Sequence, residues 1–376
     1  MKKIQMVDLV SQYEMMKPAI DTAILNVIAN AQFINGPEVT GFKAELEQFL
    51  DVKHVIPCAN GTDALQIALM ALGLKPGDEI ITPSFTYIAT TEVMALLGLK
   101  PVFIEVDPNT FCLDASQIEA AITSKTKAIV PVHLYGQCAP MNEIMEIAQR
   151  HNLFVIEDTA QAIGADYKLS NGKTVKSGTI GQIGCTSFFP SKNLGCFGDG
   201  GAMFTNDDEL AVKLKMIANH GQSKLYHHDV VGCNSRLDNI QAAVLRIKLK
   251  KLNNFNDARR KVAEHYDNFF SQFPQISIPE RAKDSTHVFH QYTLKLEGLD
   301  RNALKEFLAE KEIPSMIYYP IPAHRQKMFE SFGSSNTNLP ITDWLSERVI
   351  SLPIHTEMTK EQLDKICAAV AEFINR

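Results

Sequence analysis

The chain has 376 residues, 45% of them hydrophobic, and a formal net charge of −6. Because this length exceeds what one compact core usually supports, we expect a large domain and a smaller one. The absence of a basic stripe argues against nucleic acid as a partner and favours a small metabolite.

Two further features of the composition bear on compartment. Polar residues follow the basic start within a few positions, and no apolar run reaches secretory or membrane-spanning length, so we expect a cytoplasmic protein without a membrane partner. The seven cysteines form no CxxC pair. Their spacing fits reduced core thiols better than a disulfide framework or a zinc site, and nothing in the sequence indicates a bound metal.

Between residues 54 and 206, short apolar runs alternate with helical patterns, as in βαβ units around a mostly parallel sheet. The apolar runs predict seven strands, at 54–57, 79–83, 101–106, 127–133, 153–157, 185–189 and 201–206. Apolar residues recurring every three or four positions predict helices at 62–73, 86–98, 115–123 and 140–151. The sequence therefore predicts a large α/β domain.

The remainder of the chain has the pattern of a smaller α+β domain. The tract from Leu237 to Phe270 is rich in Ala, Leu, Lys and Arg and predicts one long helix that bridges to it. Strands are expected at 287–296 and 314–319, and helices at 301–311 and 360–375. We expect a large domain over residues 1–250 and a small one over 251–376.

The segment 187–201, SFFPSKNLGCFGDGG, holds one lysine, Lys192, in a glycine-rich loop after a predicted strand. An amine nucleophile for Schiff-base chemistry needs a crowded, partly desolvated pocket that lowers its pKa. A loop at the end of a strand offers such a place, although most lysines in loops lie on the surface. Taken alone, the segment leaves both interpretations open.

A second segment, FVIEDTAQ at 154–161, places Asp158 just past an apolar strand, where parallel-sheet proteins bind ligands. A carboxylate there can pair with a protonated pyridine nitrogen, which makes the ring an electron sink. Ala160 is small enough for a flat ring to lie against the backbone, and Gln161 could bond a ring substituent. The alternative is that Asp158 only caps the helix that follows.

Two more segments follow predicted strands. In CANGTDA at 58–64, backbone N–H groups at a helix start favour a phosphate, Gly61 allows close approach, and the hydroxyl of Thr62 can assist. For this short string alone, ordinary helix capping by Asn60, Thr62 or Asp63 is the more common explanation. In PSFTYIAT at 83–90, Tyr87 could stack on a cofactor ring or simply pack in the core.

These four segments, in this order, resemble the DegT/DnrJ/EryC1/StrS family of sugar aminotransferases, and the similarity extends over nearly the whole chain. The resemblance implies an aspartate-aminotransferase-like fold of type I, with a mostly parallel seven-stranded sheet in the large domain. It also implies pyridoxal phosphate as cofactor and a homodimer whose active sites lie between the subunits.

Carried over by position, Lys192 matches the lysine that holds the cofactor as an internal aldimine, and Asp158 matches the partner of the pyridine nitrogen. Gln161 matches the residue beside the ring hydroxyl, and Tyr87 matches the stacking aromatic. The phosphate cradle is matched by Thr62, by Asp63 through its backbone, by Ser187 and, from the neighbouring subunit, by Asn234 in GCNSRLD.

The resemblance implies transfer of an amino group, usually from glutamate, to a keto group of a nucleotide-linked sugar by a ping-pong mechanism. Related sugar dehydratases replace the aldimine lysine with histidine, and this chain keeps Lys192, which favours transamination. The alternatives are a dehydratase or amino-acid transaminase of the same fold, and a regulatory protein that keeps the fold without turnover.

The segment MIYYPIPAHRQ at 316–326, together with Arg236, resembles the branch of the family that acts at sugar C3, including aminotransferases for UDP-linked 3-keto-hexuronic acids. Arg236 could bind a sugar carboxylate bidentately, bind the carboxylate of glutamate, or form a structural ion pair with Asp238 or an acidic helix. Tyr318, Tyr319 and His324 could line the sugar or nucleotide pocket or pack in a turn of the small domain.

Overall fold

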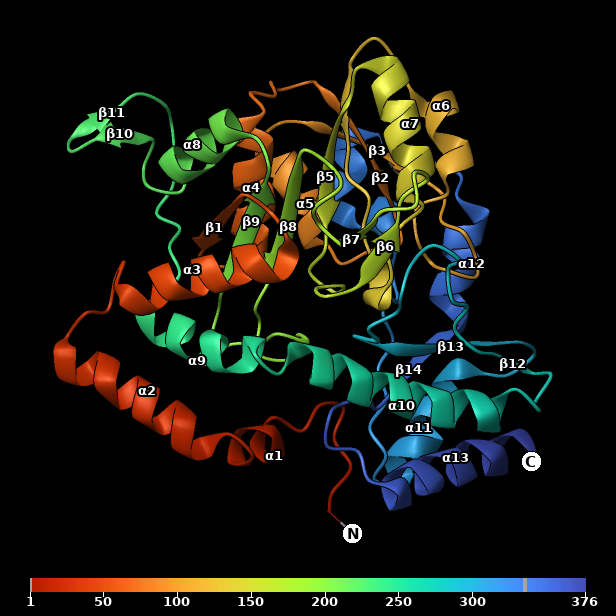
Figure 1. The fold of residues 1–376 in the computed structure, drawn as a ribbon. Helices are drawn as coiled ribbons and strands as arrows, with labels where there is room; N and C mark the ends of the chain where they lie inside the picture. Colours follow the sequence, from red (N-terminus) through yellow and green to blue (C-terminus); the bar gives the residue numbers. More distant parts are fainter. Residues whose placement is uncertain (1, 334–336) are drawn as a thin grey trace.

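The computed structural model describes residues 2–333 and 337–376. Three helices precede the first strand: α1 (Leu9–Glu14), α2 (Lys17–Asn30) and α3 (Pro37–Leu50). Sequence analysis did not predict them. Helix α3 lies against α9 (Asn239–Leu249), where Arg246 bonds to Glu38 at 2.8 Å and to Glu45 at 2.6 Å (Figure 1).

The large sheet has seven strands in the order β1-β9-β8-β5-β4-β2-β3. Their bounds are β1 (His54–Cys58), β2 (Glu79–Pro83), β3 (Lys100–Ile104), β4 (Thr126–Ile129), β5 (Phe154–Asp158), β8 (Ile183–Ser187) and β9 (Gly201–Thr205). Strand β9 runs antiparallel to both of its neighbours, and the pairs from β8 to β3 are parallel. The prediction of seven strands in a mostly parallel sheet is confirmed.

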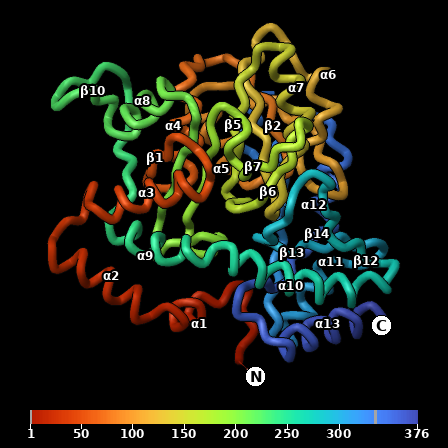
Figure 2. Tube along the Cα trace, viewed as in Figure 1, coloured from red at the N-terminus to blue at the C-terminus, as the bar shows by residue number. Residues whose placement is uncertain are grey.

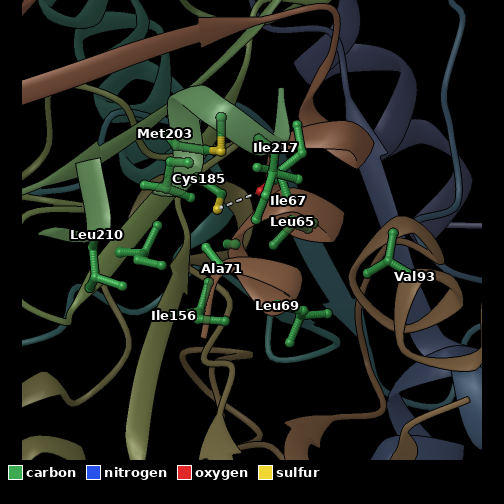
Figure 3. Packing of buried hydrophobic residues seen from close by; sticks show 14 of the residues in the cluster. Leu65, Ile67, Leu69, Ala71, Val93, Ile156, Cys185, Met203, Leu210 and Ile217 are labelled. Carbon is green, nitrogen blue, oxygen red and sulfur yellow. Dashed lines mark hydrogen bonds between the residues drawn. The ribbon is translucent and has the colours of Figure 1, made fainter. Parts of the chain in front are cut away.

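Helices pack against the sheet, and their apolar side chains form a hydrophobic core with those of the strands. Helix α4 (Gly61–Ala71) buries Leu65, Ile67 and Leu69 among strand residues such as Ile156 and Met203 (Figure 3). The Cys185 thiol donates to the Ala64 carbonyl oxygen at 3.4 Å. The other helices of this part are α5 (Ala89–Leu96), α6 (Ile118–Ala121), α7 (Met141–His151) and α8 (Asp208–Ile217), with short 3-10 turns at Ala115–Gln117 and Leu134–Gly136.

The expectation of one helix from Leu237 to Phe270 is wrong, because the tract forms two helices, α9 and α10 (Leu252–Phe270). The chain turns at Lys251, whose N–H donates to the Lys248 carbonyl at 2.9 Å. Leu245 of α9 and Leu252 at the start of α10 pack in the cluster of α3, and Tyr266 further along α10 packs in a cluster of C-terminal residues.

We call the elements from α10 to the last helix the C-terminal unit. It has a three-stranded antiparallel sheet, β12 (Ile276–Ser277), β13 (Tyr292–Leu296) and β14 (Val349–Leu352). Its further helices are α11 (Arg301–Glu310), α12 (Pro340–Arg348) and α13 (Lys360–Ile374), with 3-10 turns at Ala323–Arg325 and Lys327–Phe332. The start of the chain lies near this unit (Figure 2), and Ile4 packs in the core of the unit with residues of α13.

Two expected strands of this unit differ from the structure. The strand predicted at 314–319 is absent, because only Met316 pairs, in a single bridge to Ser351, before the chain reaches Pro320 and Pro322, which have no N–H to donate. The strand predicted at 287–296 starts only at Tyr292, since Phe289 has a φ of +48°. The boundary between residues 250 and 251 stays a prediction.

Two small hairpins complete the fold, β6 (Asp166–Lys168) with β7 (Thr174–Lys176) and β10 (Gln222–Lys224) with β11 (His227–His228). Within residues 2–333 and 337–376, no helix has the length and apolar character needed to cross a membrane.

Candidate active site

The candidate site lies where the loops after β1, β2, β5 and β8 leave the same edge of the large sheet. The strand register aligns this edge: Cys58 pairs with Gly201, Gly201 with Ser187, and Asp158 with Cys185. The segments that carry Thr62, Tyr87, Asp158 and Lys192 therefore converge there, as expected at the carboxyl ends of parallel strands.

Lys192 lies in a tight turn, where its N–H donates to the Phe189 carbonyl at 2.8 Å. Burial lowers the pKa of its amine from 10.5 to about 8, and the negative charge of Asp158 acts in the opposite direction. Its side chain makes no ion pair with any residue in the described part of the chain. A partly desolvated amine without a salt bridge is suited to Schiff-base chemistry and to proton transfer.

Buried side chains of α9 and α10 form hydrogen bonds with the loop of Lys192. The Asn193 amide donates to Asn256 of α10 at 2.8 Å and to the Val288 carbonyl at 2.9 Å. The Lys248 amine of α9 donates to the Gly195 carbonyl at 2.8 Å. Sequence analysis did not single out these contacts, because they join segments more than 50 residues apart.

Asp158 is 6% exposed at the end of β5. Its Oδ2 accepts a hydrogen bond from the Thr90 hydroxyl at 2.7 Å, and its Oδ1 accepts from the N–H of Ala160 at 3.1 Å. No regular helix begins after it, so the alternative that Asp158 only caps a helix is wrong. Thr90 was missed by the sequence interpretation, although it belongs to the same segment as Tyr87.

The side chain of Gln161 forms hydrogen bonds through both its oxygen and its nitrogen. Its Oε1 accepts from the Tyr135 N–H at 2.7 Å, and its Nε2 donates to the Tyr319 hydroxyl at 3.0 Å. Tyr87 is 57% exposed, and its ring lies 6.0 Å from the ring of Tyr319. Core packing therefore does not explain Tyr87, which presents an open aromatic face at the edge of the sheet.

The start of α4 meets β8 closely. A Cβ on Gly61 would lie 2.7 Å from the Cβ of Ser187, so only glycine allows this approach. Asn60 caps the helix, since its Oδ1 accepts from the Asp63 N–H at 2.8 Å. The capping alternative therefore holds for Asn60, and phosphate binding by Thr62, Asp63 and Ser187 stays a prediction.

Asn234 is exposed, and the next residue, Ser235, accepts a hydrogen bond from the Ala59 N–H at 3.0 Å. The segment of Asn234 thus touches the loop after β1 of its own chain. Arg236 is partly buried, and across residues 2–333 and 337–376 it forms no ion pair with Asp238 or with any other acidic side chain.

The segment of the two tyrosines reaches the site from the C-terminal unit. Tyr318 accepts a hydrogen bond from the Tyr135 hydroxyl through its carbonyl oxygen, and burial raises the pKa of Tyr319. His324 is 1% exposed, and its Nδ1 lies 2.7 Å from the Ser84 hydroxyl, just after β2. Burial lowers the pKa of His324. Its hydrogen bond to Ser84 connects the segment of the two tyrosines to the loop after β2. That Tyr318, Tyr319 and His324 line the substrate pocket stays a prediction.

The residues described contain no group of three or more His, Cys, Asp or Glu side chains that could hold a metal ion.

A family model for the DegT/DnrJ/EryC1/StrS aminotransferase family matches residues 14–371. The chain belongs to this family. A Pseudomonas aeruginosa relative named UDP-2-acetamido-2-deoxy-3-oxo-D-glucuronate aminotransferase is 46% identical over 98% of this chain and 99% of its own. A Geobacillus stearothermophilus relative named pleiotropic regulatory protein is 45% identical over 98% of both chains.

Among solved structures, the Streptomyces venezuelae family member DesV, in complex with a ketimine intermediate, superposes with a TM-score of 0.94 at 38% identity. The match covers 100% of both chains. The aminotransferase-like α/β fold predicted from the sequence is confirmed.

Proposed function

We propose that this protein is a pyridoxal-phosphate-dependent aminotransferase that moves an amino group from glutamate to a keto group of a nucleotide-linked sugar. The observation that carries the proposal is the position of Lys192, which lies partly buried in a loop that converges with buried Asp158 on one edge of the sheet. Membership of an aminotransferase family supports it over the full length of the chain.

The residues at this edge fit the cofactor. Lys192 would bind it covalently through its amine, and the Asp158 carboxylate, held by Thr90, would pair with the pyridine nitrogen. Ser187 and the start of α4 would hold the phosphate, while Tyr87 and Ala160 would lie against the ring. When bound, pyridoxal phosphate supplies an electron sink for negative charge at the α-carbon of the amino acid.

The side chains perform the proton transfers. Lys192 would be the base that removes the α-proton of the amino donor and the acid that returns a proton later in the transfer, roles that a pKa near 8 allows close to neutral pH. The charge of Asp158 favours a protonated ring nitrogen. Donor and acceptor use the site in turn, so ping-pong kinetics are expected.

The proposed acceptor is a keto group at sugar C3. The name of the Pseudomonas aeruginosa relative supports this position and a carboxylate on the sugar. Arg236, without an acidic partner in the described part of the chain, would bind that carboxylate or the one of glutamate. Tyr318, Tyr319 and His324 would line or support the sugar pocket.

A homodimer with shared sites is part of the proposal. The hairpin segment before Asn234 exposes Leu225, Tyr226 and Val231 at 72%, 83% and 84%, an apolar patch suited to burial in a partner subunit. A second copy would also bring Asn234 to the neighbouring phosphate. A cytoplasmic location is supported by seven cysteines that are all unpaired.

The second candidate is a regulatory protein, which the name of the Geobacillus stearothermophilus relative favours. Retention of Lys192 together with the hydrogen-bonded pair of Asp158 and Thr90 argues for turnover, because a protein without chemistry does not need these side chains at the same end of the sheet. A dehydratase of the same fold is disfavoured by Lys192 itself.

The proposal is tested by absorption spectroscopy and peptide mapping of the protein loaded with pyridoxal phosphate. We expect a yellow band that bleaches with glutamate, and borohydride reduction that fixes the cofactor on the peptide of Lys192. Lys192→Ala should lose both the fixed label and the bleaching. A wild-type protein that stays colourless, or a label on another lysine, would refute the proposal and favour the regulatory candidate.

A further inference from the structure

Glu157, the residue before Asp158, has a fully buried side chain. Its Oε1 accepts from the N–H groups of Ile180 and Gly181, both at 2.6 Å. Its Oε2 accepts from the Gly178 N–H at 2.9 Å and bonds to the His133 Nε2 at 2.8 Å. The two oxygens of Glu157 thus accept from four donors, an arrangement that only an ionised carboxylate satisfies fully.

The imidazole of His133 is held in one tautomer by this network. Its Nδ1 accepts from the Ala139 N–H at 3.1 Å, so its Nε2 carries the hydrogen and donates to Glu157. The backbone N–H of His133 donates to the Asp158 carbonyl at 3.0 Å, and the Asp158 N–H donates to Pro131 at 3.0 Å. His133 thus joins Glu157 through its side chain and Asp158 through its backbone.

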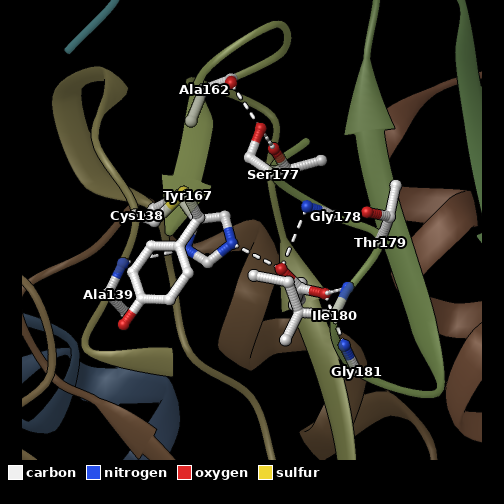
Figure 4. Close-up of polar contacts among 12 residues, drawn as sticks. Cys138, Ala139, Ala162, Tyr167, Ser177, Gly178, Thr179, Ile180 and Gly181 are labelled. Atoms are coloured by element: carbon white, nitrogen blue, oxygen red, sulfur yellow. Dashed lines mark hydrogen bonds and ion pairs between the residues drawn. The ribbon is translucent and has the colours of Figure 1, made fainter. Parts of the chain in front are cut away.

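The loop 177–181 that Glu157 holds also contacts the chain just after Asp158. The Thr159 hydroxyl bonds to the Ser177 hydroxyl at 3.0 Å, and Ser177 donates to the Ala162 carbonyl at 2.5 Å (Figure 4). A Cβ on Gly184 of β8 would lie 1.9 Å from the Gly178 carbonyl oxygen, so the loop rests directly on the sheet. Residues 157, 159 and 162 therefore all contact the loop 177–181, and Asp158, Ala160 and Gln161 lie between them in the chain.

We propose that Glu157, with His133 and the loop 177–181, forms a clamp that positions Asp158 and Gln161 for the reaction. Side chains alternate along a strand, so Glu157 lies on the face opposite to Asp158 and acts without touching substrate or cofactor. It is a positioning residue. The inference rests on the proposed function in one respect, the pairing of Asp158 with the cofactor ring.

Glu157→Gln keeps the shape of the side chain and removes the charge. Glutamine offers one oxygen and two hydrogens to four donors, so at least one backbone N–H loses its acceptor and the clamp must rearrange. A displacement of the Asp158 carboxylate by a fraction of an ångström is enough to slow chemistry that depends on alignment.

Glu79→Gln is the matched control. Glu79 is 5% exposed and bonds to Lys100 at 2.9 Å and to Thr123 at 2.5 Å, but it lies at the amino end of β2, away from the site. Both variants should lower the melting temperature. Only Glu157→Gln should slow the glutamate half-reaction, by about tenfold to a hundredfold, with little change in glutamate affinity.

The cofactor provides a second readout independent of turnover. Glu157→Gln should release pyridoxal phosphate faster on dialysis and alter the absorption band at fixed pH, whereas Glu79→Gln should match the wild type in both. If Glu157→Gln retains the half-reaction rate, cofactor release and band of the control, the clamp is structural only and the inference is wrong.

Ser177→Ala tests the same clamp if Glu157→Gln does not fold, because it removes only one hydroxyl. It should slow the half-reaction in the same direction by a smaller factor, and an unchanged rate would overturn the inference. A wild-type protein that never binds the cofactor would instead refute the proposed function, so the two failures are distinguishable.

Discussion

Replacement of Lys192 by methionine should stabilise the cofactor-free protein near neutral pH. Burial lowers the pKa of this amine from 10.5 to about 8, so the folded protein holds a charged lysine less readily than the unfolded chain does. A lowering of this size corresponds to at most about 3 kcal/mol of unfolding free energy. Methionine has a similar length and no charge, so it removes the penalty.

The sign of the pH dependence follows from the two pKa values. Below the folded value near 8 both states are protonated and the penalty is fully present. It declines as the pH rises from about 8 to 10.5 and is absent above the unfolded value. The stability difference between Lys192→Met and the wild type should therefore be largest near pH 7 and shrink as the pH rises.

The assay is urea unfolding of both cofactor-free proteins at several values between about pH 7 and about pH 10. Other groups that titrate in this range, including Lys248, affect both proteins alike and cancel in the difference. A wild type as stable as Lys192→Met at pH 7, or a difference that does not change with pH, would refute the claim that Lys192 is desolvated.

Three other predictions concern neighbouring residues. Tyr87→Ala should weaken cofactor binding by about 0.5–1.5 kcal/mol in a fluorescence titration, with an unchanged melting temperature because the ring is 57% exposed; equal affinity would exclude stacking. Asn256→Ala removes one of the two acceptors of the Asn193 amide, which still donates to Val288, and removes the donor to the Ile163 carbonyl, so it should cost about 1–3 kcal/mol in urea unfolding. An unchanged half-reaction rate in this variant would show that the role of Asn256 is purely local. Arg236→Met should raise the KM of a uronic-acid acceptor while sparing glutamate; a raised KM for glutamate alone would assign Arg236 to the donor.

The sheet was predictable because each strand is a short apolar run bounded by turn residues or helical patterns. The Lys192 and Asp158 segments were recognisable for the same reason, since each follows such a run directly. The break at Lys251 was not predictable, because the sequence on either side of it continues a helical pattern.

The supporting contacts of the site depend on the folded chain. Tyr135 reaches Gln161 from a backbone with a φ of +58°, which no local pattern assigns to a tyrosine. Thr90 and Glu157 find their partners across distances of 21 to 68 residues in the sequence. The exposure of Tyr87 was also not predictable, because the sequence around an exposed tyrosine does not differ from that around a buried one.

Transfer of nitrogen from labelled glutamate tests the central claim most directly. The holoenzyme, ¹⁵N-glutamate and a UDP-linked 3-keto-hexuronic acid are incubated together, and the sugar product is analysed by mass spectrometry and NMR. The proposed function predicts one ¹⁵N atom bonded to C3 of the sugar and loss of this product in Lys192→Ala. An unlabelled or dehydrated sugar from an active, cofactor-loaded wild type would contradict it.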